Sequence, residues 1–277
     1  MSPERLPRQL LGITVRADEV ELVSDLLWSV GVEGIEERDC PEGALLVTEA
    51  TDALVSAVSG RWPYELVDVD LGESLDAWRE WATATVLDAT SASGAVVVLR
   101  APWVPGPVRG ALEVVIDPGR SWGHGGHPTT RGAAELLVGA ADRSGVTGFA
   151  SVTVLDVGSG SGVLSILAAR LGAGRVVATD IDPLALEATA SNASRNAAVI
   201  DVVATLPDGP FDVVVANIDA SVLVDLAGTL VVRLAPKGRL ILSGMLGDAV
   251  GRVRDRCPQL TEVGRWTDGS WVAIALQ

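Results

Sequence analysis

Three glycines at alternate positions mark the middle of the chain: Gly158, Gly160 and Gly162 follow an apolar run that ends in Asp156. Such a run is typical of a buried parallel strand, and glycines at its end let the backbone turn tightly and approach a ligand closely. Residues 163–171 then predict a helix, whose free N–H groups would point at whatever the glycines hold. The pattern indicates a ligand-binding turn.

A second acid identifies the class of ligand. Asp180 ends another short apolar run, one predicted helix and one predicted strand after the glycines. An acid at the end of the second strand commonly binds a ribose in doubly wound nucleotide sites. The alternative interpretation, a tight turn that happens to lie beside a helix-capping acid, has to account for the glycines and for Asp180 separately. We therefore predict a nucleoside site.

Asn217 is expected at the same edge of the sheet. It ends the strand predicted over 211–218, and open α/β sheets bind ligands where the carboxyl ends of their parallel strands meet. An asparagine at this point could equally cap the helix predicted over 221–232. Both interpretations stay open at this stage.

The two histidines, His124 and His127, lie in a glycine-rich loop that precedes a predicted helix. Pro128 suits the first turn of that helix, and Thr129 and Thr130 can satisfy free N–H groups there or point at a ligand. The two histidines have no obvious Cys, His or acid partners, so we expect no metal. We expect the loop to close over the nucleoside instead.

Two regions are predicted to position these residues. The first reads β-α-β-β-α-β, the order of a ferredoxin-like domain, with one strand over 32–38. This region has no histidine, polar cluster or glycine loop that could carry out chemistry, so we predict a substrate-recognition domain over 1–72. A helical linker over 73–93, with its helix at 73–88, then leads to a doubly wound α/β domain over 94–277 that ends in a hairpin.

Composition limits the partners. The 277 residues carry 36 acidic and 21 basic side chains, a net charge of −15. This charge disfavours nucleic acid and favours a basic partner, although it also aids solubility. The two cysteines form no spaced pair, which argues against a disulfide framework and a zinc site. No signal peptide or membrane-spanning run is evident, so we expect a cytoplasmic monomer with no direct nucleic-acid or membrane partner.

Three motifs together resemble one family. Residues 156–162, Asp-Val-Gly-Ser-Gly-Ser-Gly, are similar to the S-adenosylmethionine signature of class I methyltransferases, whereas nicotinamide enzymes more often place the third glycine one residue later. Residues 123–130, Gly-His-Gly-Gly-His-Pro-Thr-Thr, resemble the G-T-G-x-H-P-T-T loop of bacterial ribosomal protein L11 methyltransferases. Residues 214–218, Val-Val-Ala-Asn-Ile, match the strand end of that family. The Trp-containing helix at 77–81 also fits.

The resemblance implies a Rossmann-like, seven-stranded class I methyltransferase domain preceded by a small ferredoxin-like α+β domain. It implies an enzyme that transfers methyl groups from S-adenosylmethionine to lysine or terminal amines of a basic, large-subunit ribosomal protein. The cofactor contacts of the family fall on Thr130, Gly158, Asp180 and Asn217 of this chain. We add Gly160, from the same glycine turn, to the predicted cofactor-binding residues.

Two residues depart from the family pattern: His124 replaces the Thr of G-T-G, and Asp219 replaces the usual Leu after residues 217–218. In this hypothesis Asn217 orients the amine, Asp180 binds the ribose and Thr130 holds the polar end of the methionine. His124 is the candidate for proton removal, and Asp219 the candidate for binding a cationic amine. The alternatives are an N-methyltransferase for a small molecule or another protein, and a cofactor-binding protein without turnover.

Overall fold

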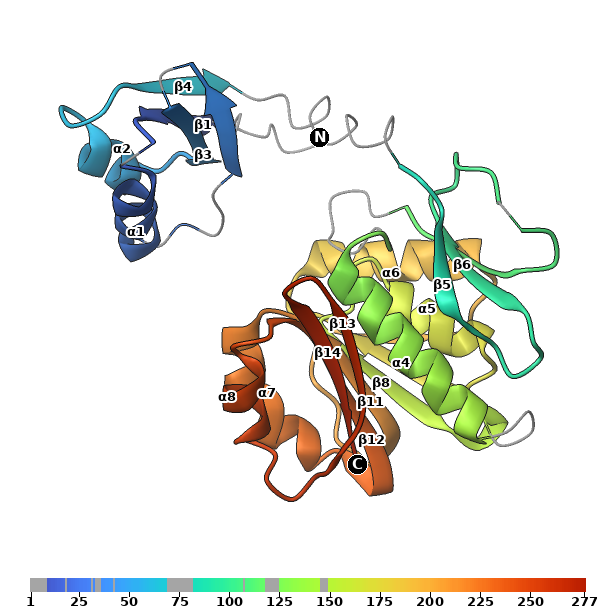
Figure 1. Cartoon of the computed structure of the whole chain (residues 1–277). Helices are drawn as coiled ribbons and strands as arrows, with labels where there is room; N and C mark the ends of the chain where they lie inside the picture. Colours follow the sequence, from blue (N-terminus) through green and yellow to red (C-terminus); the bar gives the residue numbers. More distant parts are fainter. Residues whose placement is uncertain are drawn as a thin grey trace, which may run out of the picture. The chain divides into compact units, whose positions relative to one another are not determined.

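The chain divides into two compact units, Met1–Trp81 and Ala82–Gln277, each with its own core (Figure 1). The computed structural model describes residues 9–17, 19–30, 32, 36–41, 43–68, 82–106, 108–117, 125–144 and 149–277.

The first unit is an antiparallel sheet with two helices. Its elements are β1 (Gln9–Val15), α1 (Val20–Val30), β2 (Glu36–Cys40), β3 (Gly43–Glu49), α2 (Asp52–Val58) and β4 (Tyr64–Asp68). The strand order is β2-β3-β1-β4. Apolar side chains from the sheet, such as Leu11 and Ile13, pack with Leu27 and Leu54 from the helices. This is the predicted ferredoxin-like arrangement.

The strand predicted over 32–38 is confirmed over 36–38, while Val32 lies in no strand and residues 33–35 are not among those described. β2 starts at Glu36 and pairs antiparallel with β3, with Cys40 opposite Gly43. The register of the hairpin therefore sets the limits of β2, and the sequence pattern alone did not contain that register.

The second unit is organised around a seven-stranded sheet of order β10-β9-β8-β11-β12-β14-β13. The strands are β8 (Thr153–Val157), β9 (Arg175–Thr179), β10 (Asp201–Val203), β11 (Phe211–Asn217), β12 (Leu234–Leu246), β13 (Glu262–Asp268) and β14 (Trp271–Leu276). β8 to β12 are parallel, and β14 runs antiparallel to both β12 and β13. The structure confirms the predicted doubly wound, Rossmann-like sheet with its closing hairpin.

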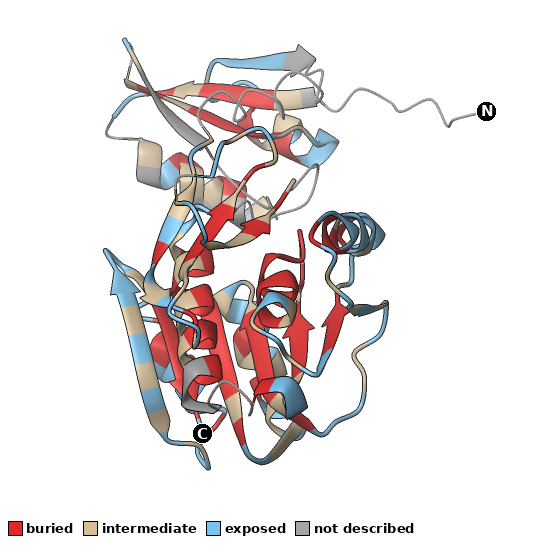
Figure 2. Cartoon of the chain, turned by 90° about the vertical axis from the view of Figure 1, so that its right-hand side faces the viewer, coloured by how far each residue is buried: buried red, intermediate tan, exposed pale blue. Residues whose placement is uncertain are grey.

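Helices cover both faces of this sheet. Their bounds are α4 (Pro128–Ser144), α5 (Val163–Arg170), α6 (Pro183–Arg195), α7 (Ala220–Val231) and α8 (Val250–Arg254). Residues of α4, α5 and α6 belong to one apolar core, and residues of α7 and α8 belong to the other. Figure 2 shows the strands between these helices as buried. The parallel strands, and with them their carboxyl ends, are therefore held in place from both faces of the sheet.

A three-stranded sheet of order β5-β6-β7 completes the second unit: β5 (Thr85–Thr90), β6 (Val96–Arg100) and β7 (Leu112–Val115). Its buried side chains share the core that contains α4 and α5. The helix predicted over 73–88 is wrong from residue 82 onward. Residues 82–84 belong to no helix, and β5 then begins at Thr85 and pairs with β6, Thr85 opposite Leu99. The rest of the predicted helix, including residues 77–81 with their two tryptophans, lies outside the described residues.

None of the helices within the described ranges is both long and apolar enough to cross a membrane.

Helix α4 packs closely on the hairpin at Gly132, where an added Cβ would lie 2.5 Å from Trp266 Cε3 and 3.0 Å from Ala273 Cβ. Gly132→Ala should therefore lower the free energy of unfolding by about 1–3 kcal/mol, although alanine favours helix. Gly228, inside α7, is the matched control because a Cβ there meets nothing within 4 Å. Gly228→Ala should raise the same quantity by about 0.5–1 kcal/mol. Urea denaturation measures both, and two stabilised variants would contradict the close packing.

Candidate functional site

The structure brings the predicted polar residues to one edge of the seven-stranded sheet. β8 lies between β9 and β11, so the glycine turn after β8, Asp180 after β9 and Asn217 at the end of β11 share that edge. Thr130, in the first turn of α4, reaches the same place, because Asn217 Nδ2 donates to its Oγ1 at 3.3 Å.

The glycine turn needs its glycines. Gly158, Gly160 and Gly162 have φ angles of +73°, +54° and +82°, in the left-handed region that other residues adopt at a cost. At Gly158 there is a second reason, since an added Cβ would overlap Ile218 Cγ2. The N–H groups of Gly158 and Ser159 both donate to the carbonyl of the last residue of β9, at 2.9 and 3.1 Å. The turn is thereby fastened to the end of the neighbouring strand.

Asp180 holds the turn and keeps acceptor capacity. Its Oδ2 accepts from the Gly160 N–H at 2.9 Å, and its Oδ1 accepts from the Asp182 N–H at 3.0 Å. A carboxylate has about four acceptor sites, so the partly exposed side chain can still accept from two neighbouring hydroxyl groups.

Sequence reasoning missed Ile181, which lies between these two acids and is 100% exposed. An isoleucine this exposed offers an apolar surface beside Asp180, where a flat apolar group could lie. The signal was an apolar residue between two aspartates at the end of a strand.

Asn217 presents a buried acceptor. Its Nδ2 is held by Thr130, and its Oδ1 is buried without a hydrogen-bond partner among the described residues. The Ser243 hydroxyl donates to the Thr129 carbonyl at 2.8 Å, which fixes the helix turn that carries Thr130. A buried amide oxygen without a partner is costly, so this atom is a candidate ligand contact.

The cap of α7 is Asp219, whose Oδ1 accepts from the Ser221 N–H at 2.7 Å. The interpretation of Asn217 as the helix cap is therefore wrong. Hydrogen bonds from the Ser221 hydroxyl and N–H hold the pKa of Asp219 below its ordinary value. The exposed carboxylate is an anion at neutral pH that can attract a cation but is a weak base.

Asp156 is buried under the turn. Its Oδ2 accepts from the Ser165 N–H at 3.0 Å and from the Ser165 hydroxyl at 2.5 Å, while its Oδ1 has no partner in the described part of the chain. Burial raises the pKa of Asp156 to about 6, against the opposing effect of the Ser165 hydrogen bonds.

The histidine loop is described in part. His124 lies outside the described residues. His127 packs edge-on against Trp271, with ring centroids 5.0 Å apart, and its Nδ1 lies 2.8 Å from Thr129 Oγ1. In the ranges that are described, no three or more His, Cys, Asp or Glu side chains come together as a metal site.

Comparisons with known proteins agree with one another. Residues 74–277 match the sequence model of a family described as "Ribosomal protein L11 methyltransferase (PrmA)". A ribosomal protein L11 methyltransferase from Deinococcus radiodurans is 34% identical over 276 residues, covering 93% of this chain and 94% of that protein. One from Azotobacter vinelandii is 45% identical over 157 residues, 55% of this chain and 51% of that protein.

The same similarity extends to a solved structure. A ribosomal protein L11 methylase from Lactobacillus delbrueckii subsp. bulgaricus has a TM-score of 0.59 and 29% identity, and the match covers 69% of this chain and 97% of that one.

The buried Asp156 predicts a pH dependence of stability. Its folded pKa of about 6 lies above the ordinary 3.8, so ionisation of the buried carboxyl progressively costs stability as the pH rises through that interval. The full cost, about 3 kcal/mol, is present above pH 6. Asp156→Asn keeps an acceptor for Ser165 without a charge. Its stability relative to the wild type should therefore be higher at pH 8 than at pH 4.5, by about 2 kcal/mol in urea denaturation, because part of the cost is already present at pH 4.5. A constant difference would refute the burial argument.

Proposed function

The chain belongs to the ribosomal protein L11 methyltransferase family, and we propose that Asn217 orients the amine that is methylated. As a member of that family it is an S-adenosylmethionine-dependent enzyme that acts on ribosomal protein L11. The observation that carries the proposal is the buried Asn217 Oδ1, an acceptor at the ligand edge of the sheet with no partner among the described residues.

The residues at this edge fit the cofactor. Asp180 would bind the ribose hydroxyls through the acceptor sites that its two backbone hydrogen bonds leave. Ile181, fully exposed, would lie against the adenine ring. The glycine turn would approach the methionine part, because Gly158 and Gly160 carry no Cβ. We assign Thr130 to the same site through Asn217, whose amide it holds.

Bound S-adenosylmethionine supplies an electrophilic methyl group on a sulfonium. The task of the protein is to place and desolvate the attacking amine. A lysine amine has an ordinary pKa of about 10.4 and must be neutral to attack, and dry surroundings lower that value. Asn217 Oδ1 would accept an N–H of the neutral amine and turn its lone pair toward the methyl group. The hydrogen bond from Asn217 Nδ2 to Thr130 keeps the oxygen turned into the site.

Asp219 would act earlier, while the amine is still a cation. Its exposed carboxylate stays ionised because Ser221 hydrogen bonds lower its pKa, so it would attract the ammonium without taking its proton. Proton removal by His124 stays a prediction, since that residue lies outside the described part of the chain.

We assign residues 1–72 to holding the protein substrate. The ferredoxin-like unit contributes no residue to the site described above, and a docked substrate would present its amine at a raised effective concentration. The net charge of −15 favours a basic partner. We further propose that the enzyme works as a monomer in the cytoplasm, where ribosomal proteins are found.

Asn217→Ala should lower kcat on the order of 100-fold while the affinity for S-adenosylmethionine changes little, because the lost contact is with the amine. Asp180→Ala is the comparison, and it should weaken cofactor binding by about 1.5–3 kcal/mol through loss of a charge-assisted ribose contact. Calorimetry gives the affinities and radiolabel transfer gives the rates. Equal losses of affinity in the two variants would make Asn217 a cofactor ligand instead.

Removal of residues 1–72 should leave cofactor affinity nearly intact and abolish most transfer to whole ribosomal protein L11, because docking is lost and the chemical site is kept. Transfer to a short lysine peptide should fall much less. Retention of the full rate on the whole protein by a folded truncated enzyme would show that this unit does not hold the substrate.

A further inference from the structure

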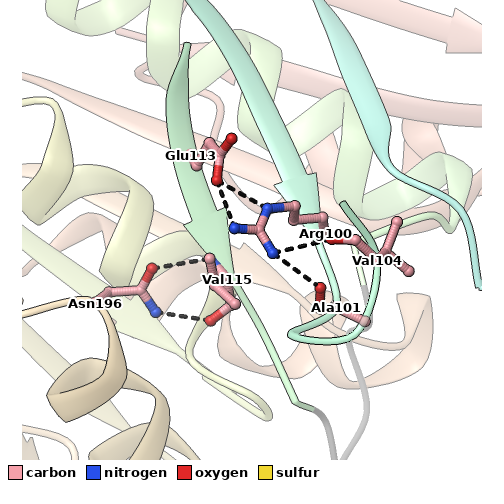
Figure 3. A network of polar contacts seen from close by, with 6 residues as sticks. All are labelled: Arg100, Ala101, Val104, Glu113, Val115 and Asn196. Carbon is pink, nitrogen blue, oxygen red and sulfur yellow. Dashed lines mark hydrogen bonds and ion pairs between the residues drawn. The ribbon is translucent and has the colours of Figure 1, made fainter. Parts of the chain in front are cut away.

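β7 is one of the two edge strands of the three-stranded sheet, and side chains bind the backbone groups along its free edge. On the side of β6, the Arg100 guanidinium holds Glu113 Oε2 at 2.6 and 2.8 Å and donates to the carbonyls of Ala101 and Val104 (Figure 3). On the opposite side, Asn196 Oδ1 accepts from the Val115 N–H at 2.8 Å, and its Nδ2 donates to the Val115 carbonyl at 2.7 Å.

Asn192, one helix turn before Asn196, makes the same pair of hydrogen bonds with Asp117, two residues after Val115. Its Oδ1 accepts from the Asp117 N–H at 3.0 Å, and its Nδ2 donates to the Asp117 carbonyl at 2.8 Å. The spacing matches, because four residues of helix rise about 6 Å and two residues of strand about 6.7 Å. Each amide carries one acceptor and two donors, so the two asparagines of α6 take the place of a neighbouring strand.

The two amides differ in their remaining donor. Asn196 Nδ2 turns back to the carbonyl of Asn192, inside α6. Asn192 Nδ2 donates instead to the carbonyl of Ser161 at 2.9 Å, in the glycine turn. Asn192 is 1% exposed, and its amide therefore joins the turn to residue 117 across the interior.

A second residue of α6 supports the turn from the same helix face. The Thr189 hydroxyl donates to the Gly160 carbonyl at 3.1 Å and lies 3.0 Å from Ser159 Oγ. Two consecutive carbonyls of the turn are thus held by α6, while Asp180 holds the Gly160 N–H. Displacement of residue 117 would therefore be transmitted to the turn through the Asn192 side chain.

We propose that Asn192 is a positioning residue. It couples cofactor binding at the glycine turn to how well the backbone of residues 115–117 is ordered. The inference rests on the proposed cofactor site. A ligand that orders the turn orders residue 117 through Asn192, and by thermodynamic reciprocity loss of the coupling weakens the ligand. Asn196 covers the same strand edge without contact to the turn, so it contributes to stability alone.

The test compares Asn192→Leu with Asn196→Leu in the full chain, with S-adenosylhomocysteine as the probe ligand. Both variants lose a two-bond clamp on the same strand edge, so both should have lower thermal midpoints. Asn192→Leu should bind the probe about tenfold more weakly by calorimetry, whereas Asn196→Leu should stay within about twofold of the wild type. Equal affinities in the two variants would overturn the coupling and leave Asn192 a structural residue.

Amide hydrogen exchange provides a second measurement, and its first comparison uses the wild type alone. The probe should slow exchange of the Asp117 N–H by about tenfold, and this effect should be absent in Asn192→Leu and present in Asn196→Leu. If exchange at Asp117 does not respond to the bound probe, the proposal is wrong even when Asn192→Leu fails to fold. A wild-type chain that does not bind the probe would contradict the cofactor site itself, and the coupling with it.

Discussion

The hydrogen bond from the Gly160 N–H to the Asp180 carboxylate joins two neighbouring strand ends, and the geometry of the site depends on it. The same carboxylate that fixes the turn is the group assigned to the ribose, so the shape of the turn and the position of the ribose acceptor cannot vary independently. Further hydrogen bonds from the turn to the end of β9 restrict the glycine backbone. A ligand at this edge meets a turn that is largely held in place, so only part of its binding energy is spent on the ordering that remains.

A second constraint acts on Asn217. Its amide is oriented by Thr130, which α4 supplies, and α4 is in turn fixed by Ser243 at the end of β12. Three elements far apart in the sequence therefore determine the direction of one oxygen. Sites built on packed helices and strands hold their groups more accurately than sites built on loops, and a methyl transfer that depends on alignment requires that accuracy.

The motifs could be found from the sequence because they are local: a strand, a turn and an acid follow one another in order. Properties set by tertiary pairing could not be found in the same way. β5 was interpreted as the end of a helix, since its pairing with β6 is not visible in the local sequence. The capping role that belongs to Asp219 was considered for Asn217, two residues away, as one of two interpretations. Asn192 and Asn196 were assigned no role, because their partners at residues 115 and 117 lie far away in the chain. Two asparagines four residues apart inside a helix are poor helix formers, and that was the available signal for their buried role.

The hairpin at the end of the large sheet has a consequence for the order of assembly. β14 lies between β12 and β13 although it follows both in the chain, and β13 joins the sheet through β14. As the chain leaves the ribosome, β12 therefore keeps an unpaired edge until β14 has been synthesised, and β13 has no place in the sheet before then. Bare strand edges recruit other chains. An aggregation-prone interval of biosynthesis should thus come late, after every residue of the cofactor site has already been made.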